Sequence, residues 1–158
     1  MVICYIAVGS NLGDRAHYIT AALRKLRQLP QTKVVRVSAL IETLPEGGPS
    51  GQGSYLNGVL EIETSLFPYH LLAELQKIEY ELGRVRTCLN APRPIDLDIL
   101  TYGEAVIREE ALCIPHPRML TRRFVLDPLE ELAPGMTAKV CSLSAPARPG
   151  KKTGRKKR

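Results

Sequence analysis

The sequence predicts an α+β fold with a ferredoxin-like β-α-β-β-α-β core and an additional strand and helix towards the C-terminus. Three observations lead to this prediction. Short β-prone runs recur along the chain, two longer segments carry apolar residues every three or four positions, and Gly, Pro and Asn separate these segments. The 158 residues, 44% of them hydrophobic, are enough for one folded domain with one core. We expect this domain to span residues 1–140.

The first half of the chain predicts a strand, a helix and a second strand. Residues 2–8 form an apolar, β-prone run that is typical of a buried strand. The following turn cluster ends at Asp14, which can cap a helix over residues 15–29. Val35, Val37, Ala39 and Ile41 then alternate with Arg36 and Ser38, and this alternation predicts one further strand over residues 33–43.

The middle of the chain repeats the pattern. A Gly-rich loop over residues 45–54 is typical of a mobile lid. A third strand is expected over residues 55–64, and Pro68 then opens a second helix that Gly83 ends. Residues 95–101 form the fourth strand of the predicted core.

The C-terminal part predicts smaller elements and a tail. We expect a short edge strand over residues 104–108, a turn over residues 115–117 and an amphipathic helix over residues 124–132. Residues 141–158 hold seven of the 22 basic residues and no acidic one, so the remaining 140 residues are close to neutral. This basic tail is interpreted as a disordered, solvated extension, with weak attachment to nucleic acid as the alternative.

Composition also limits the compartment and the partners. No apolar run approaches the roughly 18 residues of a membrane helix, and the N-terminus has no basic region of a signal peptide. The four cysteines form no CxxC pair, so we expect reduced thiols in the cytoplasm. We expect a monomer that acts on small molecules.

The strongest chemical signal is a pair of aspartates in the fourth strand. Because side chains alternate along a strand, Asp96 and Asp98 should share one face while Leu97 faces the core. Two carboxylates so close repel each other unless a cation lies between them, and hard oxygen ligands favour Mg²⁺. The alternative is a polar, solvent-facing edge strand, although Asp is a poor strand former.

Arginines precede this strand, and an aromatic–amide pair lies elsewhere. Arg84, Arg86 and Arg93 suit phosphate oxygens, although surface arginines are common. Tyr55 and Asn57 share a strand face, and together they could stack on and hydrogen-bond a flat heterocycle.

Two further groups are ambiguous on their own. His116 lies between two prolines and close to several arginines, but a lone histidine is more often structural. Gln76 and Glu79 lie off the core stripe of the second helix, where a solvated face is the default interpretation.

In this order, these motifs resemble the 6-hydroxymethyl-7,8-dihydropterin pyrophosphokinase family of folate biosynthesis. The resemblance spans roughly residues 3–132. Its most specific segment is Pro-Arg-x-x-Asp-Leu-Asp-Ile-Leu at residues 92–100. The other matching segments are residues 9–14 (Gly-Ser-Asn-Leu-Gly-Asp), 42–47 (Glu-Thr-x-Pro-x-Gly), 55–57 (Tyr-Leu-Asn), Glu79, 83–86 (Gly-Arg-Val-Arg), 115–116 (Pro-His) and 122–124 (Arg-x-Phe).

The resemblance implies transfer of the β,γ-pyrophosphoryl group of ATP to the pterin hydroxymethyl group, with release of AMP. It implies that Asp96 and Asp98 bind two Mg²⁺ ions and act catalytically with Arg84 and Arg93. The residues it implies for the pterin are Thr43, Leu44, Glu46, Tyr55, Asn57 and Phe124. Those it implies for ATP are Gln76, Glu79, Arg84, Arg86, Arg93, Ile99, His116 and Arg122.

The chain departs from the family pattern on the nucleotide side. Leu89, Asn90 and Ala91 stand where Arg-Trp-Gly is frequent, Pro117 follows His116 in place of an aromatic residue, and Ala111 and Cys113 replace an Arg and a Thr. We therefore expect different adenosine contacts. The general base stays open between Asp96 and Asp98.

Two other functions remain open. Paired aspartates also serve other magnesium-dependent nucleotide-transfer enzymes. The predicted strand order is shared with RNA-binding domains, but these stack bases on aromatics of central strands. The chain has only two Phe residues, and its first 140 residues are nearly neutral, which argues against RNA binding.

Overall fold

The computed structural model describes residues 1–85 and 87–146. The predicted ATP contact of Arg86 lies outside the described residues, as do residues 147–158 of the tail that was predicted to be disordered over residues 141–158. Residues 141–144 of that tail are helical instead. The main sheet is antiparallel and has five strands in the order β2-β4-β1-β5, with β3 also paired to β4. The strands are β1 (Val2–Ser10), β2 (Thr32–Val37), β3 (Ile41–Thr43), β4 (Tyr55–Thr64) and β5 (Asp96–Tyr102).

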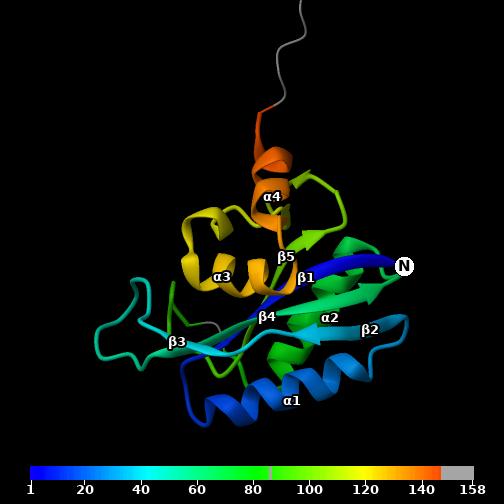
Figure 1. Ribbon diagram of the computed structural model, residues 1–158. Coiled ribbons are helices and arrows are strands. Elements are labelled where there is room, and N and C mark those ends of the chain that lie inside the picture. Colours follow the sequence, from blue (N-terminus) through cyan, green and yellow to red (C-terminus); the bar gives the residue numbers. More distant parts are fainter. Residues whose placement is uncertain (86, 147–158) are drawn as a thin grey trace, which may run out of the picture.

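One face of this sheet is covered by two helices, α1 (Arg15–Arg27) and α2 (Pro68–Glu81). In Figure 1, α1 lies below the sheet and α2 lies behind its strands. Alternate residues of the central strand β1, Cys4, Ile6 and Val8, point into this first core. The Asp14 side chain caps α1 by accepting the backbone N–H of His17 at 3.1 Å, as the turn cluster predicts.

The opposite face is covered over part of its length by α3 (Arg123–Leu132), α4 (Met136–Ser144) and the 3-10 turn η1 (Met119–Thr121), which lie above the sheet in Figure 1. A second core forms there around Tyr5, Val59 and Leu100. Further along the same strands, Gly9, Asn57 and Asp96 are paired neighbours on this face. The second core does not include them, so this end of the face is available for a site.

Most predicted elements are confirmed within a few residues, but the strand over residues 33–43 is wrong as a single element. A β-bulge between Val34 and Arg36 shifts the register with β4, so Val35 is exposed and Val34 packs against the first core. Ser38 follows β2 and exchanges hydrogen bonds with the backbone of Val59 before β3 begins. The bulge reverses the face that simple alternation assigns to Val35.

The C-terminal elements differ more from the prediction. The expected edge strand is only β6 (Ile107–Arg108), and it pairs with β7 (Cys113–Ile114) in a separate two-stranded sheet. Helix α4 was not predicted, because its sequence carries little apolar periodicity and only Val140 is fully buried. Glu130 of α3 holds its start by accepting the N–H groups of Gly135 and Thr137.

The antiparallel sheet and the four α-helices of the described residues are compatible with the predicted α+β class. Within that part of the chain, every helix is too short or too polar to cross a membrane.

Candidate active site

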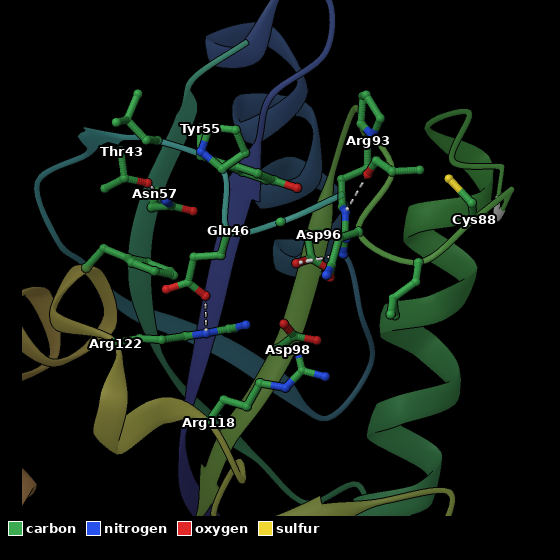
Figure 2. A pocket seen from close by; sticks show the side chains of 18 of the residues that line it. Thr43, Glu46, Tyr55, Asn57, Cys88, Arg93, Asp96, Asp98, Arg118 and Arg122 are labelled. Carbon is green, nitrogen blue, oxygen red and sulfur yellow. Dashed lines mark hydrogen bonds and ion pairs between the residues drawn. The ribbon is translucent and has the colours of Figure 1, made fainter. Parts of the chain in front are cut away.

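A cavity of about 390 Å³ opens at the uncovered end of the sheet, between loop 43–54, loop 84–93 and the turn after β7. Twelve of the predicted site residues line it (Figure 2): Thr43, Leu44, Glu46, Tyr55, Asn57, Arg84, Arg93, Asp96, Asp98, His116, Arg122 and Phe124. The structure thus brings together residues that are up to 81 positions apart in the sequence, namely Thr43 and Phe124.

Three other predicted residues lie outside the cavity wall. Gln76 is exposed on α2, which agrees with the default interpretation of a solvated helix face. Ile99 is buried in the first core. Glu79 is 3% exposed, so the solvated face is wrong for this residue. Its carboxylate accepts the backbone N–H of Leu97 at 3.3 Å and also binds the Arg84 guanidinium.

The two aspartates share the face that strand alternation predicts. Leu97 and Ile99 point into the first core, while Asp96 and Asp98 face the cavity. The Asp96 carboxylate is held by two arginines, with Arg84 at 2.9 Å from Oδ1 and Arg93 at 3.3 Å from Oδ2. The two arginines therefore fix the Asp96 carboxylate in position before any ligand enters.

Asp98 is in a different environment. Within residues 1–85 and 87–146, no hydrogen bond or ion pair reaches its carboxylate. Burial and the negative charge of Asp96 raise its pKa to about 7, against the opposing charges of Arg84, Arg93 and Arg122. A bound cation would favour the charged form of both carboxylates.

The donor set fits a magnesium ion that completes its shell with water and phosphate. The described residues contain no group of three or more His, Cys, Asp or Glu side chains arranged as a metal cage. Mg²⁺ commonly binds one or two carboxylates and takes its remaining ligands from water and substrate phosphates. Asp96 and Asp98 could hold such an ion, and the nearby arginines suit the phosphates.

The space that Tyr55 and Asn57 occupy depends on Gly9, for which the sequence predicted only a place in a turn cluster. A Cβ at Gly9 would lie 2.5 Å from Oδ1 of Asn57 and 3.5 Å from Cδ1 of Tyr55. The missing side chain therefore makes room for both residues. The Asn57 amide donates to Oγ1 of Thr43 at 2.6 Å, which ties β4 to the start of loop 43–54.

The opposite wall carries a neutral histidine and a cation. Nδ1 of His116 accepts the backbone N–H of Arg118 at 3.1 Å, so the proton of the neutral ring is on Nε2. Burial, followed by the charges of Arg122 and Arg118, lowers the pKa of His116. The Arg122 guanidinium lies 5.6 Å from the ring centre of Phe124 and 3.0 Å from Oε2 of Glu46.

Asn11 and Gln52 connect the loops around the cavity, and sequence reasoning missed both roles. Oδ1 of Asn11 accepts the Arg93 N–H at 2.9 Å, and its amide donates to Oε1 of Gln52 at 3.0 Å. The Gln52 amide in turn donates to the carbonyl of Asn90 at 3.0 Å. The only sequence features that could have indicated these roles are the position of Asn11 in a turn cluster and that of Gln52 in the Gly-rich loop.

Of the departures from the family pattern, Leu89, Asn90, Ala91 and Pro117 line the cavity. Leu89 is exposed, and Asn90 adopts a left-handed backbone with φ of 55°. Cys113 is part of β7 and lies outside the wall, as does Ala111. The expectation of altered adenosine contacts therefore rests on residues 89–91 and 117.

Comparisons with known proteins identify the family of the chain. The model of a family described as 7,8-dihydro-6-hydroxymethylpterin-pyrophosphokinase matches residues 5–134. A protein of Bacillus subtilis named 2-amino-4-hydroxy-6-hydroxymethyldihydropteridine pyrophosphokinase is 48% identical over 130 residues, which cover 82% of this chain and 77% of the relative. A protein of the same name from Haemophilus influenzae is 47% identical over 133 residues, covering 84% and 82%.

A longer fungal relative also matches. The folic acid synthesis protein fol1 of Pneumocystis carinii is 45% identical over 140 residues, which are 89% of this chain but 19% of the relative. The chain therefore spans about a fifth of that protein and most of the bacterial relatives.

Proposed function

The chain belongs to the 7,8-dihydro-6-hydroxymethylpterin-pyrophosphokinase family, and we propose that it transfers the pyrophosphoryl group of ATP to 6-hydroxymethyl-7,8-dihydropterin in folate biosynthesis. The hydroxymethyl oxygen forms a bond to the β-phosphorus, the bond from that phosphorus to the α–β bridging oxygen breaks, and AMP leaves with this oxygen. The hydroxyl proton passes to a general base in the same step, and Asp96 and Asp98 are both candidates for this base.

Tyr55, Asn57 and Phe124 form the side of the cavity that we call the acceptor wall, and this side suits a flat heterocycle. Tyr55 and Phe124 both line it, and burial raises the pKa of the Tyr55 phenol above its ordinary value. The Asn57 amide and the backbone of residues 43–46 supply donors and acceptors for the edge of the ring. Stacking together with edge hydrogen bonds is a common mode of recognising such ligands.

The donor side suits a triphosphate. Arg84, Arg93 and Arg122 line the same cavity as the aspartates, and each is held by a carboxylate of the chain. Phosphate oxygens can replace these carboxylates as partners, because guanidinium groups bind both kinds of anion in the same bidentate geometry. Neutral His116 offers its Nε2–H as a further donor.

We assign Asp96 and Asp98 to two Mg²⁺ ions. When bound, Mg²⁺ neutralises charge on the phosphate oxygens and orients the polyphosphate. The protein holds the two carboxylates on strand β5, facing the same cavity as the arginines and the acceptor wall. It thereby supplies positioning and a preorganised positive field.

One observation carries this proposal: the aspartate pair, its arginines and the aromatic–amide acceptor wall line a single cavity. The test is ³¹P NMR of the purified chain with ATP, the pterin and Mg²⁺. We expect AMP and a pterin pyrophosphate to form together, and only when all three are present. Formation of ADP and a pterin monophosphate, or no turnover with Mg²⁺, would contradict the proposal.

The remaining expectations stay proposals. We propose a ferredoxin-like arrangement for the core, which is supported by the strand order β2-β4-β1-β5 and by two helices on one face. A cytoplasmic location is supported by four free cysteines. The expectation of a monomer also stays a prediction.

A further inference from the structure

We propose that Arg118, which neither the sequence motifs nor the family resemblance assigns, is an additional phosphate-binding residue of this site and contacts the pyrophosphoryl group that is transferred. The inference rests on the function proposed above. It starts from the state of the cavity's arginines before any ligand is bound.

Four arginines of the described residues line the cavity: Arg84, Arg93, Arg118 and Arg122. The first two bind Asp96, and Arg122 binds Glu46. The Arg118 guanidinium differs, because no hydrogen bond or ion pair within the described chain reaches it. An uncompensated cation in the wall of a cavity is a site for an anion.

Arg118 is also held firmly at its backbone. Its N–H donates to Nδ1 of His116 at 3.1 Å, and its carbonyl accepts both the N–H of Thr121 at 3.2 Å and the Thr121 hydroxyl at 3.0 Å. These bonds place Arg118 at the start of η1, and in Figure 2 its side chain extends towards Asp98. A fixed backbone with a free guanidinium favours ligand binding over a role in fold stability.

The position of Arg118 points to the transferred group rather than to the phosphate that remains on AMP. A small recess of about 40 Å³ continues from the main cavity and is lined together by Asn57, Asp98, His116 and Phe124. The acceptor wall and Asp98 therefore adjoin beside His116, whose Nδ1 accepts the backbone N–H of Arg118. The group in transit passes between the acceptor and the aspartates, and Arg118 lines the main cavity with its side chain directed towards Asp98 (Figure 2).

Arg118→Ala is a clean test, because alanine retains the backbone N–H that holds His116. Arg123→Ala is the matched control. Arg123 comes from the same segment, is 88% exposed, pairs only with Asp127 among the described residues and does not line the cavity. Both variants lose one positive charge, so a general electrostatic effect should appear equally in both.

The experiment is calorimetric titration of wild type and both variants with ATP, inorganic pyrophosphate and AMP, each with Mg²⁺. We expect Arg118→Ala to bind ATP and pyrophosphate about tenfold more weakly than Arg123→Ala, the cost of one charge-assisted hydrogen bond. AMP affinity should match that of the control. Arg118→Lys should recover part of the loss.

Two results would overturn the inference. Unchanged ATP and pyrophosphate affinity in Arg118→Ala would show that the guanidinium touches no phosphate. An equal loss for AMP would place it at the phosphate that is not transferred. If the wild-type chain fails to bind ATP at all, the proposed function falls together with this inference.

Discussion

Gly9→Ala isolates the acceptor side of the site with a single methyl group. Gly9 lies in the central strand β1, between Asn57 of β4 and Asp96 of β5. Its φ is not in the left-handed region, so alanine fits the backbone, and any effect is steric. The new Cβ would lie 2.5 Å from Oδ1 of Asn57, which forces the amide away from Thr43.

The effects on stability and on binding should separate. Replacing Gly by Ala within a strand gains about 0.5–1 kcal/mol through reduced freedom of the unfolded chain. Losing the Asn57–Thr43 hydrogen bond costs about 1 kcal/mol, so overall stability should change little. Pterin binding loses an edge hydrogen bond and the space that Gly9 leaves for Tyr55 and Asn57, together about 2 kcal/mol or roughly 30-fold in Kd.

The assay is calorimetric titration of the folded variant with the pterin and, separately, with a non-hydrolysable ATP analogue. We expect weaker pterin binding and unchanged binding of the nucleotide. Gly53→Ala is the control, because its Cβ would make only an ordinary 3.4 Å contact with the Asn11 carbonyl. Unchanged pterin affinity in Gly9→Ala, or an equal loss for both ligands, would refute the reasoning.

Three further predictions follow from named contacts. Asp98→Ala should lower kcat by roughly a hundred- to thousandfold in the AMP assay while the circular dichroism spectrum stays unchanged; near-normal turnover would remove Asp98 from the metal site. Glu46→Gln breaks a half-exposed ion pair with Arg122, worth about 0.2–1 kcal/mol, and should tighten ATP binding by up to about fivefold; weaker ATP binding by calorimetry would contradict this. Glu130→Ala should lower the melting temperature near neutral pH, because its hydrogen bonds to Gly135 and Thr137 lower the pKa of this carboxyl. That stabilisation is present above the unfolded Glu pKa of about 4.3 and is lost as the pH falls through the lower folded value. The Glu130→Ala and wild-type melting curves should therefore converge in acid, whereas Glu131→Ala should match wild type throughout, and a pH-independent difference for Glu130→Ala would exclude the charged cap.

The periodicity of apolar residues was enough to predict the strands and helices in which buried and exposed side chains alternate regularly from end to end. The alternation in β5 places Leu97 in the core and Asp98 in the cavity, as predicted. The same alternation gave the wrong face for Val35 in β2. The bulge there depends on how β2 pairs with β4, and the β2 sequence alone does not predict it. Helix α4 was missed for a similar reason, since its start depends on Glu130 of the preceding helix.

Prediction of the site from the sequence was limited in the same way, because contacts between distant segments are not visible in it. Chemistry-bearing residues such as Asp96 and Tyr55 stand out by type and spacing, and the structure places them in one cavity. The burial of Glu79 could not be predicted, because it depends on how α2 faces β5 and Arg84. Gly9 contributes through the absence of a side chain, which only its neighbours in space reveal.

The central claim is that Asp96 and Asp98 together hold the metal ions at which the phosphates of ATP bind. Its most direct test is the number of Mn²⁺ ions bound, measured by electron paramagnetic resonance with a non-hydrolysable ATP analogue present. We predict two ions per wild-type chain and at most one in Asp96→Asn and in Asp98→Asn. The same number of ions, bound with the same affinity, in the wild-type chain and both variants would contradict the claim.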